Sequence, residues 1–149
     1  MKIFLLFLLF LFFICVAICV WFLYYIRFLL YKDMVYISKY LKNNISFNKK
    51  DIKTLLSETS KNISIFTRNL VFDENRNVFY FKKSDIEYVN EFFDSLGKGD
   101  VSWERNNIDF YLNTFEDMKQ ESCDSLHKNG VVYFKLILGL GLALCVMLI

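Results

Sequence analysis

Two side chains with reactive chemistry, Cys123 and His127, stand four residues apart just before an apolar segment at residues 131–149. On a helix this spacing puts both side chains on one face, where they could form a nucleophile pair or part of a metal site. A metal site needs more ligands than these two and the neighbouring Asp124, and nucleophilic catalysis needs an orienting group and an oxyanion hole. We therefore expect no catalytic residue, no metal site and no cofactor site, and the protein is predicted not to be an enzyme. A membrane-tethered enzyme that uses Cys123 and His127 is an alternative.

The composition places the chain among membrane proteins rather than disordered or nucleic-acid-binding ones. Of its 149 residues, 55% are hydrophobic and 19% are aromatic, which excludes disorder as a description of the whole chain. The 18 basic and 16 acidic residues nearly balance, so a nucleic-acid partner is not expected. The apolar residues gather at the two ends of the sequence.

Each end of the chain predicts a transmembrane helix, over residues 1–27 and 131–149. Residues 3–26 contain no charge, proline or glycine, and as a helix they would extend about 36 Å. Three rings suited to the headgroup level end this run: Trp21, Tyr24 and Tyr25. A cleaved signal peptide would have a shorter apolar core and a small-residue cleavage site, so we expect an uncleaved signal-anchor. In the second segment Lys135 lies near the start, from where its side chain can reach an interface.

Small residues spaced four apart predict close helix packing in the membrane. The helix-packing candidates are Cys15, Cys19, Gly139, Gly141 and Ala143. In an antiparallel pair of spans, Cys15 and Gly141 would lie at similar depth. The hypothesis is that the spans pack on each other or on a partner through these faces, and chance placement of small residues is the alternative.

Residues 28–130 are predicted to form a small extramembrane α+β domain that begins with a basic juxtamembrane helix over residues 28–42. Apolar residues recur at helical spacing in this segment: Leu30, Met34, Ile37 and Leu41. Four basic residues are predicted to lie on the membrane surface: Arg27, Lys32, Lys39 and Lys42. On an anionic leaflet each would contribute about 1 kcal/mol. A stalk that lifts the domain off the bilayer is the alternative.

The rest of the middle region predicts a β-hairpin followed by helices. Residues 62–73 and 77–82 are rich in β-branched and aromatic residues, and the residues between them suit a turn. Ser84 opens a predicted capping box and helix that Gly97 would end, and a further helical pattern runs through residues 108–126. The predicted fold class is therefore α+β, with the small helix-rich domain flanked by N- and C-terminal transmembrane helices.

Trp103, between the last two predicted helices of the domain, is the interface candidate, because tryptophan dominates many binding hot spots. The alternative is that its ring closes one end of a small core. Residues 27–53 carry seven basic and two acidic side chains, whereas residues 54–130 carry nine basic and fourteen acidic ones. This asymmetry suits an acidic distal end that meets a basic partner, or an ordinary solvated surface.

The basic residues that flank both spans favour a cytoplasmic middle domain, with both termini outside. The sequons at Asn44 and Asn62 point the other way if the host glycosylates them. An extracytoplasmic domain is therefore the alternative topology.

Taken together, these features predict a small two-span integral membrane protein that acts through protein–protein contacts. It would be an accessory or assembly subunit of a larger membrane complex, or an inhibitor of one, as immunity and exclusion factors are. The expected partners are membrane lipid and other membrane-protein subunits or further copies of the chain. A membrane-active oligomer, a holin-like or toxin-like pore former, is the alternative function, although neither span has a polar stripe to line a pore.

Overall fold

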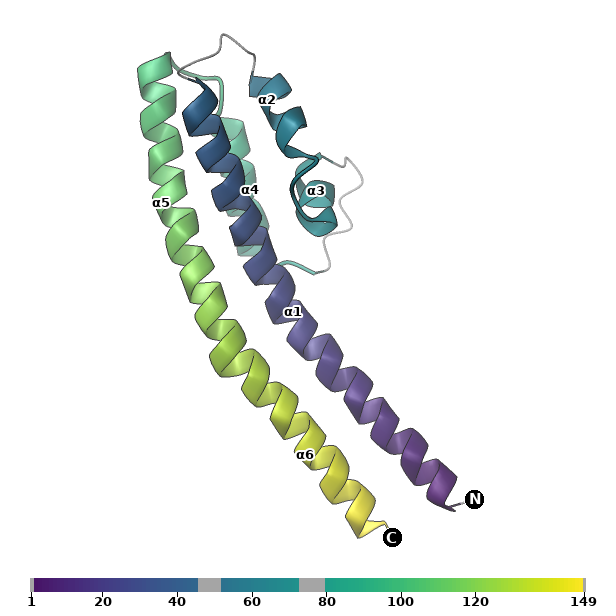
Figure 1. Ribbon diagram of the computed structural model, residues 1–149. Coiled ribbons are helices and arrows are strands. Elements are labelled where there is room, and N and C mark those ends of the chain that lie inside the picture. Colours follow the sequence, from purple (N-terminus) through teal and green to yellow (C-terminus); the bar gives the residue numbers. More distant parts are fainter. Residues whose placement is uncertain (1, 46–51, 73–79, 149) are drawn as a thin grey trace. The chain divides into compact units, whose positions relative to one another are not determined.

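The computed structural model describes residues 2–45, 52–72 and 80–148, and all regular secondary structure in these ranges is helical (Figure 1). The helices are α1 (Lys2–Ile45), α2 (Ile52–Thr59), α3 (Ile65–Phe72), α4 (Lys83–Ser95), α5 (Val101–Ser125) and α6 (Val131–Met147), with a π-helical turn at Leu126–Gly130 between α5 and α6. The predicted α+β fold with a β-hairpin is therefore wrong.

The segment predicted as the first strand, residues 62–73, instead contains helix α3. The spacing of its buried residues explains why. Ile63, Thr67 and Leu70 are buried, and their spacing of four and three residues is helical. Ser64 starts the helix, because its Oγ accepts a hydrogen bond from the Thr67 backbone N–H at 3.3 Å. Of the second predicted strand, residues 77–79 lie outside the described residues, and residues 80–82 are irregular and lead into α4.

The chain divides into two compact units, which are described separately. Unit 1 comprises Met1–Tyr25 and Ser122–Ile149, and unit 2 comprises Ile26–Glu121. Helix α1 contributes to both, and its residues up to Ile45 form one continuous helix.

In unit 2, α1 is the central element and forms the middle of the hydrophobic core, with α5 and the α2–α3 pair on opposite sides of it (Figure 1). The apolar stripe recognised in the sequence is fully buried here: Leu30, Met34, Ile37 and Leu41. Phe92 of α4 and Phe115 of α5 pack edge to face at 5.3 Å in the same core. Because this stripe faces protein, the helix over residues 28–42 does not offer it to a leaflet.

The turn between α4 and α5 follows local hydrogen-bonding rules. Gly97 adopts a positive φ of 81° just after α4, as predicted for the residue that ends this helix. Asp100 caps α5 by accepting a hydrogen bond from the Trp103 backbone N–H at 2.8 Å. Buried Glu104 accepts hydrogen bonds from the backbone N–H groups of Lys98 and Gly99.

The predicted capping box at Ser84 is not formed. Helix α4 begins at Lys83, one residue before Ser84, and no side chain caps it. Asp85, in the first turn, bonds to side chains of α1 instead.

By length and composition, two helices of the described chain could each cross a membrane: Phe4–Ile45, and Val101–Met147, which runs through the π-helical turn. In unit 1, Tyr24 of α1 stacks on Tyr133 of α6, with ring centroids 6.4 Å apart. No break separates α5 from α6, because the chain passes through the π-helical turn at Leu126–Gly130 and continues directly as α6.

Candidate functional site

The start of unit 2 contains a buried polar cluster that joins α1 to α4 and α5. The Arg27 guanidinium donates hydrogen bonds to both carboxylate oxygens of Asp85, at 3.0 and 3.4 Å, and also reaches Glu121 at 3.4 Å. The Tyr31 hydroxyl donates to Asp85 at 2.7 Å. Asp85 is only 3% exposed, so its charge needs these donors. Arg27, predicted to lie on the membrane surface, is thus held by two carboxylates of its own domain.

The surroundings of this cluster change the acidity of Tyr31. Burial and then the hydrogen bond to Asp85 raise the pKa of Tyr31 well above its ordinary value of 10.0. The hydroxyl therefore stays protonated, and can donate to Asp85, to a higher pH than an ordinary tyrosine. The hydrogen bonds of the cluster connect α1, α4 and α5.

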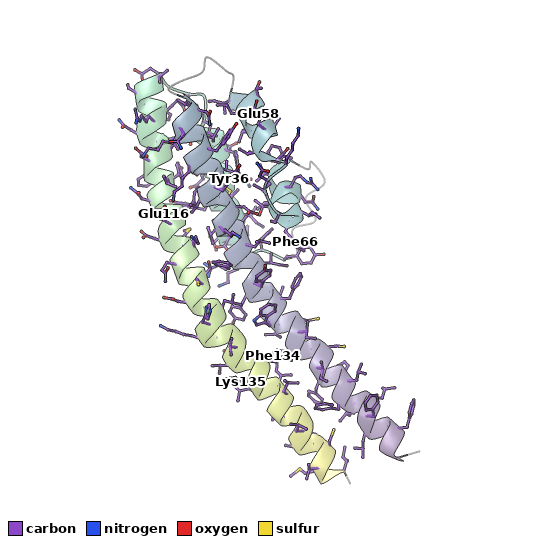
Figure 2. All side chains as sticks on the ribbon, viewed as in Figure 1. Tyr36, Glu58, Phe66, Glu116, Phe134 and Lys135 are labelled. Atoms are coloured by element: carbon purple, nitrogen blue, oxygen red, sulfur yellow. The ribbon has the colours of Figure 1, made fainter. Side chains whose placement is uncertain are left out.

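Two further ion pairs follow the α1–α5 contact away from this cluster. Lys39 Nζ lies 2.7 Å from a carboxylate oxygen of Glu116, which Figure 2 shows on α5, and Lys42 pairs with Asp109. The hydrogen bond and charge of Lys39 lower the pKa of the Glu116 carboxyl. Lys32, the fourth basic residue of the predicted set, is exposed.

The outward side of α5 presents two aromatic rings seven residues apart. Trp103 and Phe110 are 45% and 63% exposed, and Asp117 follows one further heptad along and is also exposed. Residues seven apart share one helix face. We refer to Trp103, Phe110 and Asp117 as the α5 surface.

Gly99 positions the Trp103 ring within this surface. A Cβ atom at Gly99 would lie only 2.5–2.9 Å from three atoms of the Trp103 indole, so the ring fits over the bare glycine backbone. Trp103 is therefore held in place although nearly half of it is exposed. A large exposed ring with a fixed orientation is typical of an interface anchor.

The sequence from residue 65 onward identifies the family of the chain. A model of the stage III sporulation protein AB family matches residues 65–149, which is more than half of the chain. The chain belongs to this family. Members of the stage III sporulation protein AB family are membrane-associated sporulation proteins, which agrees with the two helices apolar enough to span a membrane. No curated protein and no solved structure matches the chain.

The stage III sporulation protein AB match covers α3 to α6, so it includes the α5 surface, Asp85 and the second candidate span. The first candidate span and the α1 half of the polar cluster, Arg27 and Tyr31, lie outside the matched residues.

Within unit 1 of this family member, the helix-packing candidates differ in their surroundings. Gly141 is buried against α1, where an added Cβ would lie 2.8 Å from the Phe13 Cβ atom. An added Cβ at Gly139 would meet nothing within 4 Å. The other three candidates are exposed: Cys15, Cys19 and Ala143. Ala17, which the spacing rule did not select, is fully buried on α1.

Cys123 and His127 do lie close together, but not as an activated pair. His127 Nδ1 lies 2.9 Å from the Cys123 carbonyl oxygen and 3.7 Å from the Cys123 sulfur. A ring N–H that donates to the carbonyl cannot also accept the thiol proton. Among the residues that the structure describes, no three His, Cys, Asp or Glu side chains gather closely enough to hold a metal ion.

Asp33 is a further polar residue that sequence reasoning missed. Its Oδ2 accepts hydrogen bonds from the Ser64 backbone N–H at 2.9 Å and the Thr67 hydroxyl at 2.7 Å. This contact fixes the start of α3 to α1. A lone aspartate among the apolar positions of the α1 stripe was the available signal, because such a residue must find donors when it is buried.

Proposed function

We propose that this member of the stage III sporulation protein AB family is a two-span membrane protein that acts through protein–protein contacts. In this proposal it serves sporulation as an accessory or assembly subunit of a larger membrane complex. The α5 surface carries the proposal, because Trp103 and Phe110 expose large rings on a helix whose opposite side is packed in the core. The middle domain is proposed to face the cytoplasm, on the basis of the basic residues flanking the spans.

The contact is tested by site-specific photo-crosslinking of the full chain in sporulating cells. A photoreactive amino acid at position 103 or 110 is expected to yield a discrete crosslinked product. The matched control is position 61, because Lys61 is also an exposed residue of unit 2 but lies before α3. Equal products from all three positions, or none from 103 and 110, would contradict the proposed contact.

Two substitutions separate loss of the ring from loss of its orientation. Trp103→Ala removes the ring, whereas Gly99→Ala keeps the ring but forces it out of its present position. Both are expected to lower the number of spores by at least tenfold while the protein accumulates normally. Lys98→Ala, next to Gly99 and exposed, is expected to have no effect.

The same assay distinguishes a subunit from an inhibitor. Loss of a required subunit lowers spore formation, whereas loss of an inhibitor raises or advances it. Unchanged spore formation with both Trp103→Ala and Gly99→Ala would refute an essential role for the α5 surface.

A further inference from the structure

Helix α3 and the segment before α4 share a second surface that mixes apolar and basic side chains. Ile65, Phe72 and Tyr80 are 62%, 41% and 52% exposed. The ring of Phe66, labelled in Figure 2, packs edge to face with Tyr80 at 6.1 Å, so α3 and this segment are joined. Three exposed basic residues accompany the apolar ones: Arg68, Lys82 and Lys83. We refer to these three apolar and three basic residues as the α3 surface.

Hydrogen bonds within unit 2 place this surface near the residue at which the chain leaves its first apolar run. Arg27 follows that run directly, and it is bonded to Asp85, two residues after Lys83. Thr67 of α3 is bonded to Asp33. Asp33 lies six residues from Arg27, or about 9 Å along α1. The α3 surface therefore belongs to the end of unit 2 at which α1 leaves the first apolar run.

Among the described residues of this region the charges have one sign, whereas Asp73, Glu74 and Arg76 fall between the two described ranges and lie outside them. Residues 61–72 and 80–84 contain four basic residues and no acidic residue. Lys83 also has a long contact of 3.7 Å with Glu87, and both side chains remain exposed. By contrast, Arg27, Lys39 and Lys42 already pair with carboxylates of unit 2. The α3 surface thus holds basic side chains beside exposed apolar ones, the combination with which peripheral segments bind anionic lipid.

We propose that the α3 surface rests on the headgroup region of the anionic leaflet next to the spans. Phe72, Tyr80 and Ile65 enter the headgroup layer, and the three basic side chains bind lipid phosphates. The contact orients the domain on the membrane through a part of the chain other than the basic helix that the sequence suggested. The partner is the phosphate of a phospholipid within a bilayer, rather than phosphate in solution.

The test measures the distance of single positions from the bilayer in the full chain. The four cysteines are replaced by serine or alanine, Phe72→Cys is introduced and labelled with a fluorophore, and the protein is reconstituted in nanodiscs. The lipids are phosphatidylcholine with phosphatidylglycerol, and some carry a nitroxide quencher at the headgroup. The control is Phe110→Cys, because Phe110 is also exposed and its neighbour Asp109 pairs with Lys42, fifteen residues or about 22 Å along α1 from Arg27.

We expect at least threefold stronger quenching at position 72 than at position 110. Equal quenching at the two positions would overturn the proposal. If Phe72→Cys lowers the helical circular dichroism, Tyr80→Cys replaces it, with the same expected result.

Charge is tested in the same discs. Replacing Arg68, Lys82 and Lys83 by glutamine, or omitting phosphatidylglycerol, should reduce quenching at position 72 by at least half. Replacing the exposed Lys98 and Arg105 by glutamine is the matched control and should leave it unchanged. Inorganic phosphate added to phosphatidylcholine discs should not restore quenching. Restoration by inorganic phosphate, or insensitivity to both changes, would refute recognition of lipid phosphate.

Discussion

At the scale of single residues, Asp85 connects helix α4 to helix α1 in unit 2. Its carboxylate is almost fully buried and is bonded to two α1 side chains, Arg27 and Tyr31. Helix α4 thereby gains a fixed rotation about its axis and a fixed distance from α1. Removing one partner leaves the other buried without its counterpart, which costs more than the intact pair contributes.

Asp85→Asn is expected to lower the free energy of unfolding of unit 2 by about 2 kcal/mol. This loss is smaller than the roughly 3–5 kcal/mol typical of a broken buried ion pair, because the Arg27 side chain retains 18% exposure and also contacts Glu121. Denaturant titration of the purified protein in detergent, followed by circular dichroism, measures it. Glu87→Gln on the same helix is the control and should change stability by less than about 0.5 kcal/mol. Equal effects of the two substitutions would contradict the assigned role.

Tyr31 predicts a dependence of stability on alkaline pH. Burial and the hydrogen bond to Asp85 raise the pKa of Tyr31 in the folded state above its unfolded value of 10.0. Its contribution to stability is therefore complete below pH 10 and decreases as the pH rises further, because only the unfolded chain then loses the proton. The difference in melting temperature between wild type and Tyr31→Phe should be constant between about pH 7 and 9 and shrink above about pH 10. A difference that does not change with pH would disprove the raised pKa.

At the scale of elements, sequence patterns predicted most helices but misassigned α3. The stripe in residues 28–42, the Gly97 terminator and the long apolar ends all depend on residues close in sequence, and helices are present at each. The β-branched and aromatic residues of α3 are typical of a strand. The helical signal consists of only three buried positions, Ile63, Thr67 and Leu70, and is too short to stand out in the sequence. The fixing contact from Asp33 spans 31 residues, so no local pattern contains it.

Contacts between residues distant in sequence also explain why the candidate site was only partly predicted. Trp103 was recognisable from its residue type. Phe110 lies on the same surface because α5 already begins at Val101, whereas the helical pattern in the sequence began only at residue 108. The partners of Arg27 lie 58 and 94 residues away, so its ion pairs could not be distinguished from a surface charge in the sequence. Ser84 and Glu87 satisfied a capping pattern, but α4 starts one residue earlier.

The contact between α1 and α6 in unit 1 predicts opposite effects for two neighbouring glycines. Gly141→Ala puts a methyl group 2.8 Å from the Phe13 Cβ, which cannot rotate away, and is expected to destabilise the helix pair by about 1–3 kcal/mol. Gly139→Ala meets open space and should be neutral or slightly stabilising, because alanine favours helix. Thermal unfolding in detergent micelles compares them. Equal loss from both substitutions would rule out this packing.

The ion pair between Lys39 and Glu116 predicts a small and salt-dependent coupling. Both side chains are about half exposed, at 54% and 46%, so a double-mutant cycle with Lys39→Gln and Glu116→Gln should give about 0.5 kcal/mol. The coupling should decrease as ionic strength rises from about 0.01 to 1 M, because the Debye length shortens. A coupling above about 2 kcal/mol that is independent of salt would mean that the pair is shielded from solvent.

At the scale of the whole molecule, the uneven charge of the sequence has an internal explanation. The basic residues after the first apolar run and the acidic residues of α5 meet in ion pairs along the α1–α5 contact of unit 2. Three of the seven basic residues in 27–53, namely Arg27, Lys39 and Lys42, are therefore paired with carboxylates when unit 2 folds. The basic residues of the α3 surface take no part in these α1–α5 ion pairs, and we propose that they bind lipid phosphates instead.

The proposed topology predicts the reactivity of Cys123. In a variant whose other three cysteines, Cys15, Cys19 and Cys145, are replaced, a membrane-impermeant thiol reagent should label Cys123 after lysis but not in intact cells. Cys123 is partly exposed, so labelling in the lysate is the internal control for access. Labelling in intact cells would instead place the middle domain outside and make Asn44 and Asn62 the next residues to test for glycosylation.

The central position of α1 also determines when unit 2 can fold during synthesis. The helix that forms the middle of the core is made first, and its partner Glu121 is made 94 residues after Arg27. At about 5–20 residues per second, the ribosome needs on the order of 5–20 s to cover that interval. Before α5 is synthesised, one side of the apolar stripe from Leu30 to Leu41 is uncovered. Core formation must then bring together segments that are distant in sequence, which slows folding. Nascent chains arrested before α5 should therefore bind chaperones or the bilayer through a stripe that the finished domain buries completely.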